Sequence, residues 1–278
     1  MKSRSILNVV LLCVVLALLA VVAFSSNEQD EVVSLMDLRA GAINEITVNL
    51  PYKESVLLVR KASGWEIVEP IEAQANSFRI EMLLQLAEAR SYASYSVRPQ
   101  DLKRYQLAPP LGSIKFNDQH FSFGAVEPLN RRRYVLNNDT VQLIAERYYY
   151  QAMVALPALL DPAILPSESD LKKIELPGFS VIRDADSGWK IDGSELLSME
   201  DVNALVQKWQ QAKATQITAY NDDASEAVIK IQLSDGRLFE FDLLQTDPEL
   251  ILGRRDMGMR YHLGEQSGLL GFSRKLEN

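Results

Sequence analysis

The chain carries one order of sequence landmarks twice, and this internal duplication limits its fold more than any other feature. A Gly-Trp pair at Gly64-Trp65 recurs at Gly188-Trp189, each time inside a short strand-like segment. Ile46 and Tyr134 have counterparts at nearly the same spacing, Ile174 and Tyr261. The insertions between landmarks differ, so we expect a structural duplication into two similar units rather than a tandem array.

Short segments that alternate apolar and polar residues, bounded by Pro, Gly and Ser, predict antiparallel strands in both halves. In the first half they cover residues 43–48, 56–60, 64–67, 113–116, 121–124, 133–136 and 141–145. In the second half they cover residues 171–176, 180–183, 188–191, 228–233, 238–243, 250–252 and 260–263. One amphipathic helix follows each Gly-Trp strand, with Asn76 as the expected N-cap of the first and Ser198 with Asp201 as a capping box in the second. The expected fold class is α+β: two similar lobes, each an antiparallel sheet with one main amphipathic helix.

An uncharged apolar run, Ile6 to Phe24, precedes this duplicated part and is interrupted only by Asn8. At 1.5 Å per residue a helix of this length spans roughly 28 Å, close to the hydrocarbon core of a bilayer. Lys2 and Arg4 lie before the run, so the positive-inside rule leaves the N-terminus in the cytoplasm and exports the rest. The alternative is a signal peptide, but the A-x-A cleavage pattern is missing.

The sequence therefore divides into four parts. Residues 1–26 are expected to form an N-terminal membrane anchor or uncleaved signal, and residues 27–42 a linker. Residues 43–166 form the first repeat with a connector helix, and residues 167–278 form the second repeat.

Composition argues against several classes of function. The formal net charge of −8, from 29 basic and 37 acidic residues, disfavours nucleic-acid binding. The only cysteine, Cys13, lies in the apolar run, so neither an intrachain disulfide nor a cysteine metal site can form. His120 and His262 are the only histidines, and neither lies in a metal-binding pattern. Serine-nucleophile, P-loop and Rossmann motifs are missing from the sequence. We expect no catalytic residue, no cofactor and no metal.

Two groups of residues are candidates for binding a partner. Arg131, Arg132 and Arg133 precede Tyr134, while Arg254, Arg255 and Arg260 precede Tyr261, which suggests equivalent arginine loops in the two repeats. Guanidinium groups can pair with an acidic partner or with anionic headgroups, although solvated hairpin loops explain them as well. Tyr148, Tyr149 and Tyr150 spread around a helix, where they either pack between the repeats or meet a partner. Trp65 and Trp189 are expected in the core under each helix.

Three stretches of this sequence resemble a known family. They are Trp65-x4-Pro70, then Asp101-Leu102-x2-Tyr105-x-Leu107-x-Pro109-Pro110, and finally Val141-x-Leu143-Ile144 with Leu156-Pro157 and Leu165-Pro166. The chain is similar, over most of residues 40–270, to bacterial extracytoplasmic domains of unknown function. These are often encoded beside gliding-motility-type ABC transporters and their auxiliary components. Where the family usually has Tyr-Gly-Leu, this chain has Tyr105-Gln106-Leu107.

The resemblance implies a membrane-anchored partner-binding domain without assigned catalytic residues. Three hypotheses follow. The first is a non-catalytic accessory or scaffold protein, single-pass in the bacterial inner membrane, whose periplasmic domain binds a transporter or other envelope complex. The second is a periplasmic module that binds a small envelope ligand, a glycan or a lipid, between the repeats. The third is an envelope hydrolase with two carboxylates converging in a cleft.

Overall fold

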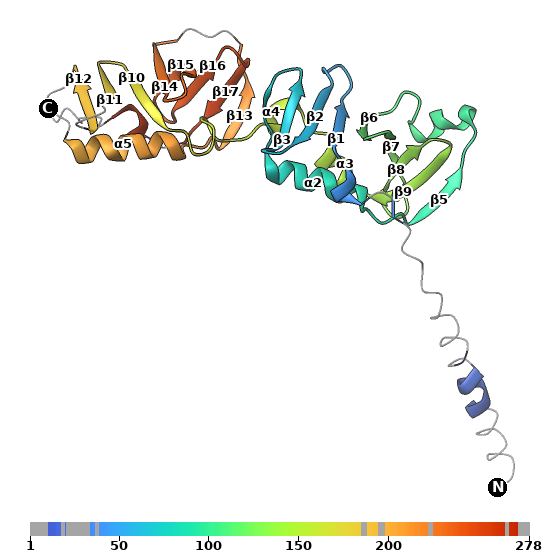
Figure 1. Ribbon diagram of the computed structural model, residues 1–278. Coiled ribbons are helices and arrows are strands. Elements are labelled where there is room, and N and C mark those ends of the chain that lie inside the picture. Colours follow the sequence, from blue (N-terminus) through green and yellow to red (C-terminus); the bar gives the residue numbers. More distant parts are fainter. Residues whose placement is uncertain are drawn as a thin grey trace.

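The computed structural model describes residues 11–17, 20, 34–36, 39–184, 188–193, 198–221, 225–264 and 267–271. Within these residues the chain folds into two lobes that lie side by side, each built on one antiparallel sheet (Figure 1). The expected antiparallel α+β architecture with two lobes is confirmed.

The first lobe holds a nine-stranded sheet in the order β4-β3-β2-β1-β6-β7-β8-β9-β5. Its strands are β1 (Glu45–Asn49), β2 (Val56–Lys61), β3 (Gly64–Glu69), β4 (Ala73–Gln74), β5 (Ala93–Ser96), β6 (Gly112–Phe116), β7 (Gln119–Val126), β8 (Arg132–Asn137) and β9 (Thr140–Ala145). Its helices are η1 (Ala40–Ala42), α2 (Ser77–Ala87) and η2 (Pro99–Tyr105). Asn76 caps α2 as expected, because its side chain accepts the Arg79 N–H at 3.2 Å.

The second lobe holds an eight-stranded sheet in the order β12-β11-β10-β14-β15-β16-β17-β13. Its strands are β10 (Leu171–Leu176), β11 (Phe179–Asp184), β12 (Gly188–Asp192), β13 (Gln216–Ala219), β14 (Ala227–Leu233), β15 (Leu238–Gln245), β16 (Ile251–Arg254) and β17 (Met259–His262). Its helices are α5 (Met199–Gln211), which begins with the predicted Ser198–Asp201 capping box, and η3 (Ser267–Leu270).

The two sheets repeat one topology. In each, three strands form a meander, a helix follows, and a short crossover strand then pairs at the far edge with the last strand of a second meander. The crossover strand β5 pairs with β9 just as β13 pairs with β17. The lobes are therefore equivalent strand by strand, apart from the two-residue strand β4.

This equivalence corrects the sequence alignment at one place. Tyr134 lies in β8, whereas Tyr261 lies in β17, which is the counterpart of β9. The crossover loop after β13 is shorter than the one after β5, so later strands in the second lobe come earlier than the Trp65–Trp189 spacing suggests. Arg131–Arg133 and Arg254–Arg255 are thus not equivalent: the first run leads into the start of β8, whereas the second lies at the end of β16, the counterpart of β8.

The tryptophans also differ from expectation. Trp65 and Trp189 are only half-buried at the margin of the core, and the Arg60 guanidinium lies 5.0 Å from the Trp65 ring centroid. The fully buried tryptophan is Trp209 on α5, whose ring packs 5.9 Å from Phe241 and whose Nε1 donates to the Leu269 carbonyl. The helix face, rather than the Gly-Trp strand, supplies the large core side chain of the second lobe.

Residues 11–17 are helical. In the part of the chain that the structure describes, no helix has the length and apolar character needed to cross a membrane. Most of the anchor expected at residues 1–26, and residues 27–33 and 37–38 of the expected linker, lie outside the described residues. Leu35 and Met36 are buried against the first lobe.

Candidate functional site

A cleft of about 550 Å³ lies between the two lobes and is the main candidate for a binding site. Both lobes and the connector contribute to its walls. The lining comprises Ser63, Glu72, Ala73, Gln74, Leu160, Asp161, Ala163, Ile164, Leu165, Pro166, Ser167, Arg237, Phe239, Arg254, Met257 and Tyr261. Its volume lies in the range typical of sites for small molecules.

The connector forms the floor of this cleft and is bonded to both lobes. It begins with two short helices, α3 (Arg147–Ala152) and α4 (Leu156–Leu159), with Pro157 in the first turn of α4. Beyond α4, the Asp161 N–H donates to the Gln74 carbonyl at 3.0 Å, on the edge of the first sheet. The Pro162 carbonyl then accepts the Ala214 N–H at 2.8 Å, just before β13 of the second lobe. The cleft is therefore set between two sheets that share a backbone connection.

The wall from the second lobe combines a guanidinium with apolar and aromatic side chains. Arg254 donates from Nε to Asp256 Oδ1 at 2.9 Å, and its guanidinium lies 5.2 Å from the Phe239 ring centroid. The ion pair with Arg254 lowers the pKa of Asp256. Burial raises the pKa of Tyr261, whose hydroxyl lies 3.5 Å from Met257 Sδ. With Arg237, which pairs with Asp235, this wall offers two cations held by carboxylates beside an apolar surface.

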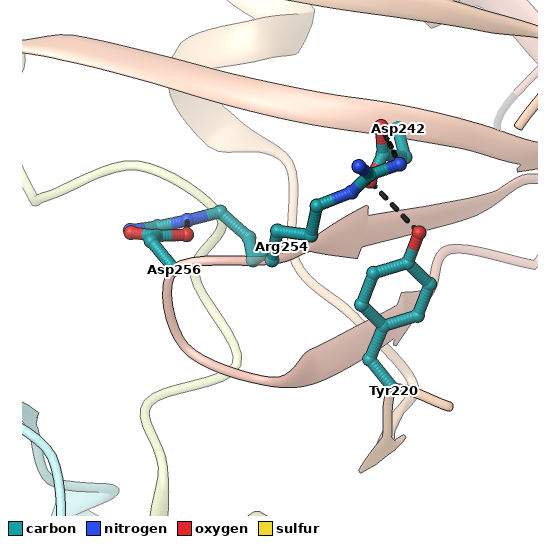
Figure 2. Close-up of polar contacts among 5 residues, drawn as sticks. Tyr220, Asp242, Arg254 and Asp256 are labelled. Atoms are coloured by element: carbon teal, nitrogen blue, oxygen red, sulfur yellow. Dashed lines mark hydrogen bonds and ion pairs between the residues drawn. The ribbon is translucent and has the colours of Figure 1, made fainter. Parts of the chain in front are cut away.

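Arg255, the next residue, belongs to a separate polar cluster with Asp242 and Tyr220. In Figure 2, Asp242 and Tyr220 lie apart from the pair of Arg254 with Asp256. Its Nε donates to Asp242 Oδ2 at 2.8 Å, and its Nη2 donates to Oδ1 at 3.3 Å. The Tyr220 hydroxyl also donates to Asp242, and the Arg260 guanidinium lies 6.0 Å from the Tyr220 ring. Of the three arginines predicted here, only Arg254 lines the cleft, while Arg255 and Arg260 surround Tyr220.

The arginines of the first lobe differ sharply from one another. Arg133 is buried in an ion pair with Glu146, and its Nη1 donates to the Gly124 carbonyl. Arg131 is exposed with a φ of 53°. Arg132 is half-buried, with its guanidinium 3.7 Å from the Tyr92 ring centroid. Arg133 is thus a structural residue, and only the first two arginines of the run are accessible.

The three tyrosines of α3 take three environments. Tyr148 is buried. Tyr149 packs edge-on against Phe123 at 5.6 Å and receives the Arg133 guanidinium at 3.9 Å from its ring centroid. Tyr150 is exposed and contacts Tyr149 edge-on. The run therefore mostly supports the first lobe, and Tyr150 alone presents its ring to solvent.

The acid–base groups of the described residues are dispersed over the molecule. His262 Nδ1 lies 2.9 Å from Glu249 Oε1, and its Nε2 lies 3.1 Å from Thr218 Oγ1. Glu72 and Asp161 both line the cleft, but Asp161 Oδ1 accepts the Ala163 N–H at 2.9 Å and so holds a local turn. Among the described residues, no group of three or more His, Cys, Asp or Glu side chains could hold a metal ion.

Sequence reasoning missed most of the cleft, notably Arg237, Phe239 and Met257. They come from segments far apart in the chain from Gln74 and Leu165, and no local pattern connects them. A strand-by-strand alignment of the repeats would have placed the connector between two sheet edges, which is the one available signal.

Comparison with known proteins gives one match. The model of the family described as "Domain of unknown function (DUF4340)" matches residues 65–240. Neither the curated proteins nor the solved structures gave a match.

Proposed function

The chain belongs to the DUF4340 family of domains of unknown function, and from its geometry we propose that it is a membrane-anchored, periplasmic, non-catalytic accessory protein. Its binding site is the cleft between the lobes, and the occupant is a segment of an envelope protein such as a transporter. The observation that carries this proposal is the cleft of about 550 Å³, lined by both lobes and their connector.

The chemistry of the lining suits a polypeptide segment. Arg237 and Arg254 bring positive charge to the cleft, and Glu72 and Asp161 bring negative charge. Phe239 adds an apolar surface. A peptide carries apolar side chains, charges and backbone amides together, so it can match such a mixed lining, whereas a lipid tail would place hydrocarbon against the charged groups and remove them from water.

The proposed anchor is the apolar run at residues 6–24, with the first lobe next to the membrane. The fold attaches to the chain soon after this run, since the Leu35 N–H donates to the Ala89 carbonyl at 2.7 Å. The Gln142 side chain donates to the Leu35 carbonyl at 3.1 Å. Ser34 lies ten positions after Phe24, and an extended chain of ten steps spans at most about 36 Å.

A second candidate function is the binding of a small envelope ligand, a glycan or a lipid headgroup, in the same cleft. The observation that favours it is the volume, since pockets for small molecules occupy about 300–1,000 Å³. A third, hydrolysis, would use Glu72 with Asp161. The bond from Ala163 to Asp161 gives that carboxylate a structural role and supports the non-catalytic proposal.

Site-specific photo-crosslinking from the cleft rim tests the proposal in the full chain in its native membranes. A benzophenone amino acid replaces Ser63 in the β2–β3 turn or Ser167 in the connector, both exposed residues of the cleft lining, and in a control it replaces exposed Asp118 in the β6–β7 turn. We expect both rim positions to capture the same envelope protein, and Met257→Trp, which fills the cleft, to abolish this capture. Equal capture from Asp118 would contradict the proposal.

The same experiment separates the alternatives. The second candidate would be established by two results together. The rim positions would capture no protein, and a purified envelope glycan or phospholipid would produce a thermal shift that is lost in Met257→Trp. Hydrolysis of an envelope substrate that Glu72→Gln abolishes would establish the third.

A further inference from the structure

The β7–β8 loop, residues 127–131, exposes Leu129 to solvent, and hydrogen bonds within the loop fix its backbone. The Glu127 carboxylate is 9% exposed and accepts the N–H groups of Leu129 at 2.8 Å and Asn130 at 2.7 Å. The Glu127 N–H donates in turn to the Arg132 carbonyl at 2.7 Å. At the tip, Leu129 is 89% exposed. Single exposed leucines are common, but here a buried carboxylate fixes the loop that presents this one.

Cationic and aromatic residues lie in the same loop as this leucine or pack at the start of the strand that follows it. Arg131 follows in the same loop and is exposed. The guanidinium groups of Arg132 and Arg90 lie 3.7 Å and 5.2 Å from the ring centroid of Tyr92, which is itself 41% exposed. Together, Leu129, Arg131, Arg132 and Tyr92 form a basic and amphipathic surface, here named the proximal patch, on a protein whose net charge is −8.

The proximal patch lies where the N-terminal segment joins the fold. Arg90 forms an isolated antiparallel bridge with Ser34, the first described residue of the fold. Tyr92, two residues later, contacts Arg132 at the start of β8. A surface beside Ser34 is within chain reach of the end of the apolar run at Phe24.

The second lobe provides an internal comparison. The counterpart of the β7–β8 loop is the β15–β16 loop, which carries Asp247 and Glu249. Its leucine, Leu250, is buried at 2% exposure. The loop with an exposed leucine next to Arg131 and Arg132 thus belongs to the lobe that adjoins the N-terminal segment, whereas the acidic loop with a buried leucine belongs to the other lobe.

We propose that the proximal patch docks on the anionic headgroup layer of the membrane, with Leu129 inserted at the interface and Arg131 and Arg132 on lipid phosphates. The inference rests on the membrane anchor of the proposed function. Guanidinium groups bind phosphate, and tyrosine is favoured at membrane interfaces. Each cation near an anionic membrane surface adds to the free energy of binding. Docking fixes the first lobe against the bilayer and directs the second lobe away from it.

The test uses the full chain with Cys13→Ala, reconstituted in phosphatidylcholine vesicles with or without 30% phosphatidylglycerol. An environment-sensitive fluorophore is attached through Leu129→Cys, or through Leu238→Cys as a matched control, because Leu238 is an exposed leucine of the second lobe. Flotation at high salt first reports anchoring, and quenching by a doxyl-labelled lipid then reports contact with the bilayer.

We expect the label at position 129, and not the label at 238, to be quenched in the vesicles that contain phosphatidylglycerol. Reversing both patch charges, Arg131→Glu with Arg132→Glu, should lower the ratio of docked to undocked molecules by at least about fivefold. The control Lys172→Glu with Lys190→Glu, at exposed positions of the second lobe, should leave it unchanged.

Each outcome separates the inference from the proposed function. Flotation without quenching at 129 overturns the proximal patch and keeps the anchor. Failure to float in phosphatidylcholine, with flotation and quenching when phosphatidylglycerol is present, overturns the anchor and keeps the patch. Failure to float in either vesicle overturns both. If the charge reversal does not reduce quenching, the electrostatic contact is overturned. If quenching is lost only when an acidic protein is added, a protein is identified as the occupant.

Discussion

The Tyr220 hydroxyl and the Arg255 Nε both donate to one oxygen of Asp242, Oδ2, each at 2.8 Å (Figure 2). Asp242 is only 7% exposed in β15, whereas Tyr220 directly follows the crossover strand β13. The carboxylate thus connects the edge of the second sheet to its centre across strands that are not neighbours.

Removing this carboxylate should destabilise the second lobe. Asp242→Ala removes the acceptor of the bonds from the Tyr220 hydroxyl and the Arg255 guanidinium, and we expect the free energy of unfolding to fall by about 1–3 kcal/mol. Thermal unfolding of the full chain in mild detergent, followed by the fluorescence of buried Trp209, measures the change. Asp256→Ala removes an exposed partner of Arg254 and should change stability by less than about 1 kcal/mol. Equal losses in the two variants would show that Asp242 has no special role.

The Arg133–Glu146 ion pair should be a main stabilising contact of the first lobe. Arg133→Ala leaves the Glu146 carboxylate and the Gly124 carbonyl without their donor and removes the cation over Tyr149. We expect a loss of about 3 kcal/mol in denaturant unfolding. The neighbouring exposed Arg131→Ala should change stability by no more than about 0.5 kcal/mol. A mild Arg133 variant would argue that this ion pair is replaced by solvent at little cost.

Gly124 is required by close packing rather than by backbone conformation. A Cβ at this position would lie 2.2 Å from the Tyr105 carbonyl oxygen and 2.9 Å from Leu107 Cγ, in the segment that includes the end of η2. We expect Gly124→Ala to cost about 1–3 kcal/mol and to expose this segment to limited proteolysis. Gly41→Ala, where the Cβ meets nothing within 4 Å, is the control. Protease resistance equal to the wild type would mean that the cover over β7 shifts freely.

Low pH should reduce the stability of helix α5, because it protonates Asp201 of the capping box. Hydrogen bonds from Ser198, first its hydroxyl and then its N–H, lower the pKa of Asp201. Since the folded pKa lies below the unfolded one, the stabilisation is present above the ordinary value of 3.8 and is lost as pH falls through the lowered value. Asp201→Asn should therefore flatten the decline in stability between about pH 5 and pH 2. Glu200→Gln, outside the capping box, should leave the wild-type slope, and an unchanged slope in Asp201→Asn would refute this assignment.

Local patterns in the sequence predicted the local structure well. The alternating segments became strands, and the Ser198–Asp201 spacing became a capping box, because both depend on residues close in the chain. The four-residue crossover strands β5 and β13 escaped prediction since they are too short to show a period. They nevertheless complete both sheets.

Long-range relationships were less accessible. The sequence of an arginine run is the same whether its side chains are solvated or buried. Only the fold shows that Arg133 forms an ion pair with Glu146 while Arg131 remains exposed. The pairing of Tyr134 with Tyr261 failed because a shorter crossover loop shifts every later strand of the second lobe. The cleft residues converge from both lobes, so no window of the sequence contains the site.

The connector that joins the lobes has a mechanical consequence. Asp161 is bonded to the first sheet, and its neighbour Pro162 is bonded to the segment that leads into β13 of the second. Because these two adjacent residues are hydrogen-bonded to different lobes, a movement that closes the lobes on each other would have to break backbone hydrogen bonds to one of them. We therefore expect the cleft to keep a constant width. We expect the proposed occupant to be selected by whether its cross-section fits, and its binding to leave the outline of the molecule unchanged.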